Sequence, residues 1–348
     1  MECHFFLGAC SCKGFVSHYD SLFEEIGNLN IIKGGSGCGK STFMKALGKA
    51  AEERGYEVSY ILCSSDPDSL DGVLIPKLSV GYVDGTAPHV LEPLICAGSA
   101  NYLNFGSFYD REGIKANEGE IHSFRKRNQA CYLLAHSCLK AMDALTEGVK
   151  SQTQGSDYDE ELQAIGECLC LSALKPKWGT GKLLRRFLSA LTPKGVKVLS
   201  STPMRLCSKV YVLQDHYALA PRVLDQVLKN ALSQGYDCIA GYSPLQPEGS
   251  PPYLLIPEAA VAFVSHSRLF PYEGESFCRI DLDSTLPPKL RKDLSYVESA
   301  CHNLLEYCLS HLKQAKAYHD HMEELCKPFV NFPAVTALTQ QTITQIFP

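Results

Sequence analysis

Residues 33–42 read Lys33-Gly34-Gly35-Ser36-Gly37-Cys38-Gly39-Lys40-Ser41-Thr42. From Gly34 onward the stretch fits the pattern G-x-x-x-x-G-K-[ST], whose main chain wraps the phosphates of a nucleoside triphosphate. The run Leu29–Ile32 before it is short and apolar, as in a buried strand, and Phe43–Ala51 after it has apolar residues at helical spacing. The loop therefore stands between a strand and a helix, where its chemistry requires it to be.

The loop predicts a site for ATP and Mg²⁺. Its glycines tolerate positive φ and close approach, so successive N–H groups can face an anion. We expect Lys40 to act on the β and γ phosphates, Ser41 to bind Mg²⁺ through its hydroxyl, and Thr42 to support the helix start. The residues expected to bind the nucleotide are Gly34, Gly35, Ser36, Gly37, Cys38, Gly39, Lys40, Ser41 and Thr42. The alternative is a glycine-rich turn with a surface lysine.

Composition restricts the class of protein. The 348 residues allow two domains, and 45% hydrophobic with 20% charged residues is ordinary for a globular chain. A net charge of −5 gives no basic footprint for nucleic acid. No apolar run is long enough for a membrane span, and the N-terminus lacks the basic region of a signal peptide. The 16 cysteines are scattered through apolar runs, which favours free thiols in the reducing cytoplasm.

Short-range cysteine and histidine spacings do not predict a metal site. Cys10/Cys12 and Cys168/Cys170 have C-x-C spacing without the matched C-x₂-C halves of zinc sites. His319 and His321 are two residues apart on an expected helix, so they face different directions, and we expect them to be solvated or to cap the helix.

The chain repeats itself. Lys13-Gly14 recurs as Lys194-Gly195, and Leu74-Ile75-Pro76 recurs as Leu255-Ile256-Pro257, both at a spacing of 181 residues. Landmarks that keep one order and one spacing indicate duplication of a whole domain. We therefore expect a phosphate-loop domain over residues 1–180, with a helical segment over about 111–174, and a second copy over residues 181–348.

Strands alternate with helices in the first copy, which predicts parallel sheets covered on both faces. The expected fold is α/β, of the P-loop NTPase type, with parallel sheets flanked by helices and the unit duplicated. The expected elements are a strand at His4–Gly8, a helix at Phe15–Ile26, strands at Glu57–Leu62, Leu78–Val83 and Asn101–Phe105, and a helix at Arg111–Glu147.

The second copy has lost the phosphate loop. Its strand Lys209–Leu213 leads into Gln214–Arg222, which has no glycine and carries Asp215 where an anion would bind. We expect this main chain to form no ring of inward N–H groups and Asp215 to repel phosphate. The helix Val223–Leu232 after it keeps its apolar face, so the fold is expected to persist without the chemistry.

Acidic residues complete the first site. Asp84 ends an apolar strand, the usual place for the acid that holds Mg²⁺, and its counterpart at the repeat spacing is Ser265. The alternative for Asp84 is a turn with Gly85. No glutamate follows Asp84, so we expect Asp66 to serve as the catalytic acid or base. Asp68 and Asp71 are further candidates, and a solvated turn is the alternative for all three.

Two other groups are candidate neighbours of the site. His89 follows Asp84 just past the end of its strand, where ligands of open parallel sheets bind. Arg125 and Arg127 are candidates for a lid over the phosphates, with a solvated charged face as the alternative.

The segments 4–15, 63–72 and 84–89, together with the phosphate loop, resemble a little-characterised family of bacterial ATP-binding proteins or ATPases built of two tandem P-loop halves. The resemblance covers nearly the whole chain, and the Cys63-Ser64-Ser65-Asp66 and Asp84–His89 segments are its most distinctive parts. It implies ATP binding by a cytoplasmic protein. Members of this family also keep a phosphate loop in the second half, and this chain does not.

Three functions remain open from the sequence. The first is an Mg-dependent ATPase with one active site, in which hydrolysis drives a conformational change. The second is a kinase acting on a small molecule or nucleotide, and the third is an ATP-dependent binding switch with negligible turnover. A GTPase is disfavoured because no Asn-Lys-x-Asp segment is present. The expected partner is a nucleoside triphosphate, with no nucleic acid and no membrane.

Overall fold

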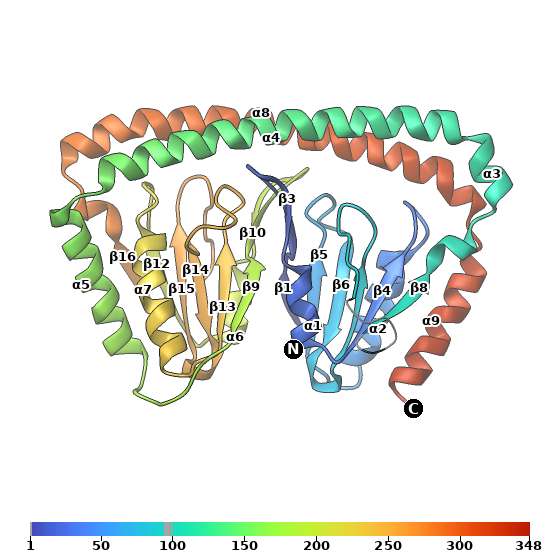
Figure 1. The fold of residues 1–348 in the computed structure, drawn as a ribbon, viewed down its shortest axis with the longest axis horizontal. Coiled ribbons are helices and arrows are strands. Elements are labelled where there is room, and N and C mark those ends of the chain that lie inside the picture. The colour runs from blue at the N-terminus through green and yellow to red at the C-terminus, as the bar shows by residue number, and fades with distance from the viewer. Residues whose placement is uncertain (1, 94–97, 99) are drawn as a thin grey trace.

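Two six-stranded sheets stand side by side beneath a pair of long helices in the computed structural model of this chain (Figure 1). The structure describes residues 2–93, 98 and 100–348. The first half contains β1 (Glu2–Phe5), β2 (Gly8–Ser11), β3 (Gly14–Ser17), α1 (Leu22–Glu25), β4 (Asn28–Lys33), α2 (Lys40–Glu52), β5 (Val58–Leu62), β6 (Leu70–Ile75), β7 (Val80–Asp84), β8 (Ala100–Asn104), α3 (Arg111–Ala116), α4 (Glu118–Thr153) and α5 (Ser156–Ala173).

The second half repeats this series with few changes. Its elements are β9 (Leu183–Phe187), β10 (Ser189–Thr192), β11 (Gly195–Val198), α6 (Ser201–Leu206), β12 (Lys209–Gln214), α7 (Ala220–Ser233), β13 (Cys238–Tyr242), β14 (Tyr253–Ile256), β15 (Val261–His266), β16 (Cys278–Asp281), α8 (Pro288–Cys326) and α9 (Phe332–Ile346). Short 3₁₀ turns connect several of them, among them η3 (Phe105–Phe108) and η6 (Lys327–Phe329).

Both sheets are mixed, and the prediction of parallel sheets is wrong at one strand in each. The first sheet has the order β1-β5-β6-β7-β4-β8, and the second has β9-β13-β14-β15-β12-β16. In each sheet one strand, β6 or β14, is antiparallel to both of its neighbours, and the other strands pair in parallel. The link from β5 to β6 is too short for the crossover that a parallel pair needs, so the chain reverses instead.

The structure confirms two similar halves. In the first sheet Ile32 pairs with Asp84, and in the second Leu213 pairs with Ser265, which is the same pairing shifted by 181 residues. Unusual backbone conformations recur at the same spacing. Ser79 and Ala260 both have positive φ, and so do Gly14 and Gly195. The repeated sequence landmarks therefore reflect a repeated fold.

The expected helix at Phe15–Ile26 is wrong over most of its length. The main chain turns at Gly14, which has a φ of 95°, and β2 and β3 pair as an antiparallel hairpin. Helical structure is limited to the 3₁₀ turn Tyr19–Ser21 and the short α1. The expected strand at His4–Gly8 is likewise divided, because β1 ends at Phe5 and β2 begins at Gly8.

The long helices exchange their ends between the halves. α4 and α8 run antiparallel across the top of both sheets in Figure 1, and Asn128 of α4 donates a hydrogen bond to the Ala315 carbonyl of α8. α5, which follows α4, packs on α7 of the second half. α9, which follows α8, packs on α2 of the first half. The helical segment expected at 111–174 therefore covers both sheets.

The two halves share one hydrophobic core. Its fully buried residues include Phe6 and Leu7 from the first half and Phe187 and Leu188 from the second. A buried ion pair between Arg186 and Glu25 also crosses from one half to the other. Over the described part of the chain every cysteine is a free thiol, and Cys96 lies outside it. No helix in the same residues is both long enough and apolar enough to span a bilayer.

Candidate functional site

The 34–39 loop connects β4 to α2, as its sequence predicts. Gly37 and Gly39 adopt left-handed φ values of 76° and 89°, which place the loop in a conformation that residues with side chains rarely take. The main-chain N–H groups of Gly35, Gly37 and Gly39 have no acceptor among the described residues. These donors and the first turn of α2 give the loop the polarity of an anion-binding cradle.

Lys40 lies folded back over this loop. Its Nζ donates hydrogen bonds to the carbonyl oxygens of Gly34 at 2.7 Å and Gly35 at 2.8 Å. The same Nζ lies 3.5 Å from the Asp84 Oδ2 atom, and both side chains are 14% exposed. The lysine and acid that the sequence singled out are therefore neighbours, because β7 pairs in parallel with β4 and ends beside it.

Thr86 holds the acid and the loop together. Its main-chain N–H donates to Asp84 Oδ1 at 2.8 Å. Its hydroxyl donates to the Gly34 carbonyl at 3.0 Å and accepts from the Gly34 N–H at 3.2 Å. Asp84 thus belongs to a local turn as well as facing Lys40, so the two sequence interpretations of this residue are compatible.

Ser41 and Thr42 begin α2, beside the loop. The Ser41 hydroxyl accepts a hydrogen bond at 2.9 Å from the Leu70 N–H at the start of β6. That bond uses one lone pair and leaves the second available for a cation. Thr42 is exposed on the surface of the helix. Cys38 is buried, and burial raises the pKa of its thiol, whose S–H donates to the Gly35 carbonyl at 3.1 Å.

Residues from distant segments cover the loop, and the sequence did not reveal them. The Tyr109 hydroxyl donates to the Ser36 carbonyl at 2.6 Å, and His319 Nε2 lies 3.3 Å from Ser36 Oγ. His319 is therefore part of the loop's surroundings as well as of α8, which differs from the expectation of a merely solvated or capping histidine. At Gly39, a Cβ atom would lie 3.3 Å from Val335 of α9. No local sequence signal indicates such contacts.

The structure does not bring Asp66 to Lys40. Asp66 pairs instead with Lys316 of α8 at 3.5 Å, and Asp68 forms an exposed ion pair with Lys194 of the second half. Arg125 and Arg127 are exposed on α4, where the Arg127 guanidinium lies over the Phe124 and Tyr318 rings. The charged residues proposed for a lid thus form a solvated face.

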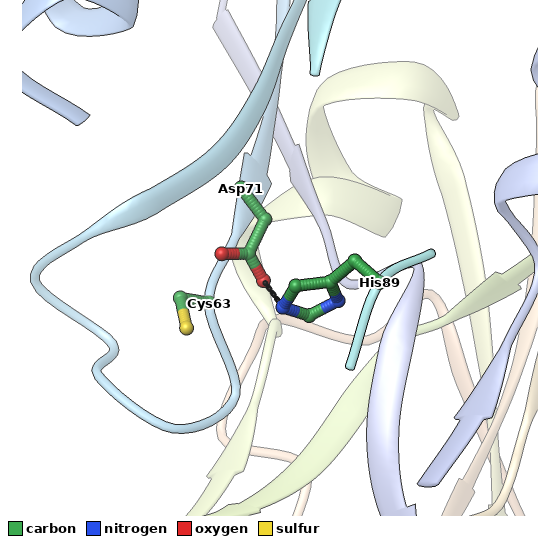
Figure 2. A group of neighbouring side chains, drawn as sticks. All are labelled: Cys63, Asp71 and His89. Atoms are coloured by element: carbon green, nitrogen blue, oxygen red, sulfur yellow. Dashed lines mark ion pairs between the residues drawn. The ribbon is translucent and has the colours of Figure 1, made fainter. Parts of the chain in front are cut away.

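A third group of polar side chains lies buried beside these elements (Figure 2). Cys63 follows β5, Asp71 belongs to β6, and His89 lies in the segment after β7. Their potential ligand atoms lie within 4.8 Å of one another, and His89 Nε2 is 3.3 Å from Asp71 Oδ2. Asp71 and His89 are only 4% and 6% exposed. The expectation that His89 lies near the phosphate loop gains a specific partner here.

Burial dominates the electrostatics of this group. It raises the pKa of Asp71, against the lowering effect of His89. Burial and the Asp71 carboxylate raise the pKa of the Cys63 thiol well above its usual value, while the main-chain amides of Ser65 and Asp66 lower it. Asp84 and Lys40 also influence the Asp71 pKa, so this group adjoins the Lys40–Asp84 pair.

The equivalent loop of the second half keeps more of the phosphate-loop backbone than the sequence predicts. Ala218, at the position of Gly37, has a left-handed φ of 59°. The N–H groups of Leu219 and Ala220 do point inward, but they donate to the Asp215 carboxylate at 2.7 and 2.9 Å. Burial raises the pKa of Asp215 to about 6. The chain's own carboxylate thus occupies the place of an anion.

This loop borders a cavity of about 110 Å³. Asp215, Ser265 and Tyr253 line it from the sheet side, and Val149 of α4 and Cys301 of α8 line it from the helix side. The Ser265 hydroxyl lies 3.5 Å from Asp215 Oδ2, so the position equivalent to Asp84 contacts the internal carboxylate.

Compared with known protein families, curated proteins and solved structures, the chain matches none of them. The resemblance to a family with two tandem P-loop halves therefore stays a prediction.

Proposed function

We propose that this protein binds ATP with Mg²⁺ at residues 34–42 and hydrolyses it, with one active site in the first half. The observation that carries the proposal is the Lys40–Asp84 pair, 3.5 Å apart at the mouth of a loop with unpaired N–H groups. Lysine acts on the terminal phosphates in phosphate loops, and an acid on the neighbouring strand holds the Mg²⁺ shell. On binding, the Lys40 ammonium exchanges two carbonyls for phosphate oxygens.

The second half serves a structural role in this proposal. Asp215 already accepts the hydrogen bonds of the α7 N-terminus, so a phosphate there would meet a buried negative group. Phosphate and carboxylate repel each other strongly where water is excluded. We therefore expect one ATP per chain. We also expect a reducing cytoplasmic location, which the free cysteines support.

An ATP-dependent switch is a second candidate, and one observation favours it. The C-terminal part of α8 contacts the loop through His319 and Ser36, while its N-terminal part, including Cys301, lines the cavity of the second half. Nucleotide-dependent movement of the loop would act on a helix that extends to the other half. Slow turnover with tight binding would favour this switch over a rapid ATPase.

The test compares nucleotide binding and turnover in the wild type, Lys40→Ala and the matched control Lys49→Ala. Lys49 lies on the same helix but is exposed and pairs only with Glu53. We expect Lys40→Ala to lose ATP affinity by about tenfold or more and to lose hydrolysis, with Lys49→Ala unchanged. Product analysis with a metabolite pool separates hydrolysis from phosphate transfer. Equal affinity of Lys40→Ala and the wild type would refute the site, and two ATP per chain would refute the silent second half.

A further inference from the structure

Three side chains with different donor atoms meet beside the phosphate loop without forming a complete hydrogen-bond network. Asp71 Oδ2 and His89 Nδ1 are buried and have no hydrogen-bond partner. The hydroxyl of Tyr19, which adjoins Asp71 and Cys63, is also buried without a partner. Buried polar atoms are normally paired, and unpaired ones call for a specific explanation such as a bound ion.

The separation of the atoms matches a coordination sphere. His89 Nε2 and Asp71 Oδ2 are 3.3 Å apart but are not aligned as donor and acceptor. Nitrogen and oxygen ligands of tetrahedral zinc, each about 2.0–2.2 Å from the ion, lie about 3.4 Å from each other. Cys63 Sγ lies within 4.8 Å of both atoms, so a small side-chain rotation completes a three-ligand face.

The donor set selects the type of cation. One thiolate, one imidazole and one carboxylate are typical ligands for zinc and similar transition metals, whereas Mg²⁺ requires oxygen donors in octahedral geometry. The imidazole lies between aromatic rings, with Phe15 at 4.8 Å and Tyr19 at 5.4 Å between ring centroids, so its orientation is restricted. We propose that Cys63, Asp71 and His89 bind a zinc-like divalent transition-metal ion next to the phosphate loop.

The second half shows that the fold does not require these residue types. At the repeat spacing, Cys63 corresponds to Ser243, Asp71 to Pro252 and His89 to Phe270. All three replacements line the cavity beside Asp215. A structural role alone would be served equally well by such residues, so the concentration of donors in the first half points to a ligand. Three protein ligands also leave a fourth position for water, as in catalytic zinc sites.

The proposal does not depend on ATP binding, and metal titration tests it directly. Full-length protein is freed of metal with a chelator and titrated with Co²⁺, then with Zn²⁺ in competition, in the presence of excess Mg²⁺. We expect one equivalent of Co²⁺, with the near-ultraviolet absorption of a cobalt–thiolate bond, and its displacement by Zn²⁺ but not by Mg²⁺. Binding of less than one equivalent, or displacement by Mg²⁺, would overturn the proposal.

Variants then identify the ligands. Cys63→Ser is expected to lose the thiolate absorption, and His89→Ala is expected to weaken Co²⁺ affinity by about tenfold or more. Cys278→Ser, which removes an exposed thiol in β16, serves as the control and should match the wild type. Zn²⁺ should raise the melting temperature of the wild type and the control but not of Cys63→Ser. A Cys63→Ser protein that folds and keeps the thiolate absorption would exclude this site.

Discussion

Phe6 and Phe187 exchange a reciprocal pair of main-chain hydrogen bonds at the centre of the molecule. The Phe6 N–H donates to the Phe187 carbonyl at 3.0 Å, and the Phe187 N–H donates to the Phe6 carbonyl at 2.8 Å. The two residues are equivalent positions of the two repeats and are both fully buried. The halves therefore meet along an approximate twofold axis.

A chain divided between residues 176 and 177 should fold only when both pieces are present. Each piece alone exposes the shared core around Phe6 and Phe187 and lacks the outer helix, α5 or α9, that covers its own sheet. We expect each fragment to show weak, non-cooperative unfolding by circular dichroism, and an equimolar mixture to recover a cooperative transition. Cooperative unfolding of either fragment alone would contradict the exchange of helices.

Arg186→Ala should destabilise the protein by about 3–5 kcal/mol, because it leaves the partly buried Glu25 carboxylate without its partner. Urea unfolding measures the loss. The double variant Arg186→Ala with Glu25→Gln removes the unpaired charge and should recover part of the stability. An equal or larger loss in the double variant would show that the pair contributes through packing instead.

Asp84→Asn should remove the dependence of ATP affinity on Mg²⁺. The amide can still accept the Thr86 N–H, so the turn is preserved, but the charge that holds the cation is gone. We expect magnesium to improve ATP affinity by about tenfold or more in the wild type and by little in the variant, measured by calorimetry with and without chelator. Asp68→Asn, an exposed change, should behave as the wild type. A full magnesium effect in Asp84→Asn would assign the cation to another residue.

Gly39→Ala should weaken both the fold and the nucleotide site. The left-handed φ of 89° costs an alanine about 1–2 kcal/mol, and its Cβ would press on Val335 at 3.3 Å. Gly148→Ala, in the middle of α4 with open space around it, should instead be neutral or stabilising by up to about 1 kcal/mol. Thermal unfolding and ATP titration of both variants provide the comparison, and equal behaviour would show that the loop tolerates a side chain.

Asp215 predicts that part of the stability is lost as pH rises. Its folded-state pKa of about 6 lies above the unfolded value of 3.8, so between these values the folded chain binds more protons. Stability from this group is present below about pH 4 and falls as pH rises to about 6, by up to about 3 kcal/mol. Asp215→Asn should remove this dependence in urea unfolding at several pH values. Parallel curves for variant and wild type would contradict the assignment.

The sequence predicted the elements with strong local signals and missed those set by long-range contacts. The phosphate loop, β4, α2 and the repeat follow from glycine spacing, apolar runs and landmarks at one offset. The antiparallel β6 was missed because the direction of a strand depends on its neighbours, and the β2–β3 hairpin depends on the turn at Gly14.

The same distinction applies to the site. The proximity of Asp84 and Lys40 could be predicted because parallel neighbouring strands end at one edge. Tyr109, His319 and Val335 reach the loop through the exchange of the long helices, which no local pattern encodes. Asp71 was named only as one of three acids, since its pairing with His89 requires the fold.

The exchange of α5 and α9 around a twofold axis is the arrangement of a domain-swapped homodimer, here joined into one polypeptide. In a symmetric dimer every substitution alters both subunits, so an inactivating change such as an aspartate in the phosphate loop removes all activity. Covalent fusion frees each copy to vary alone. One can become a silent scaffold that contributes α9 to its neighbour while the neighbour retains its chemistry.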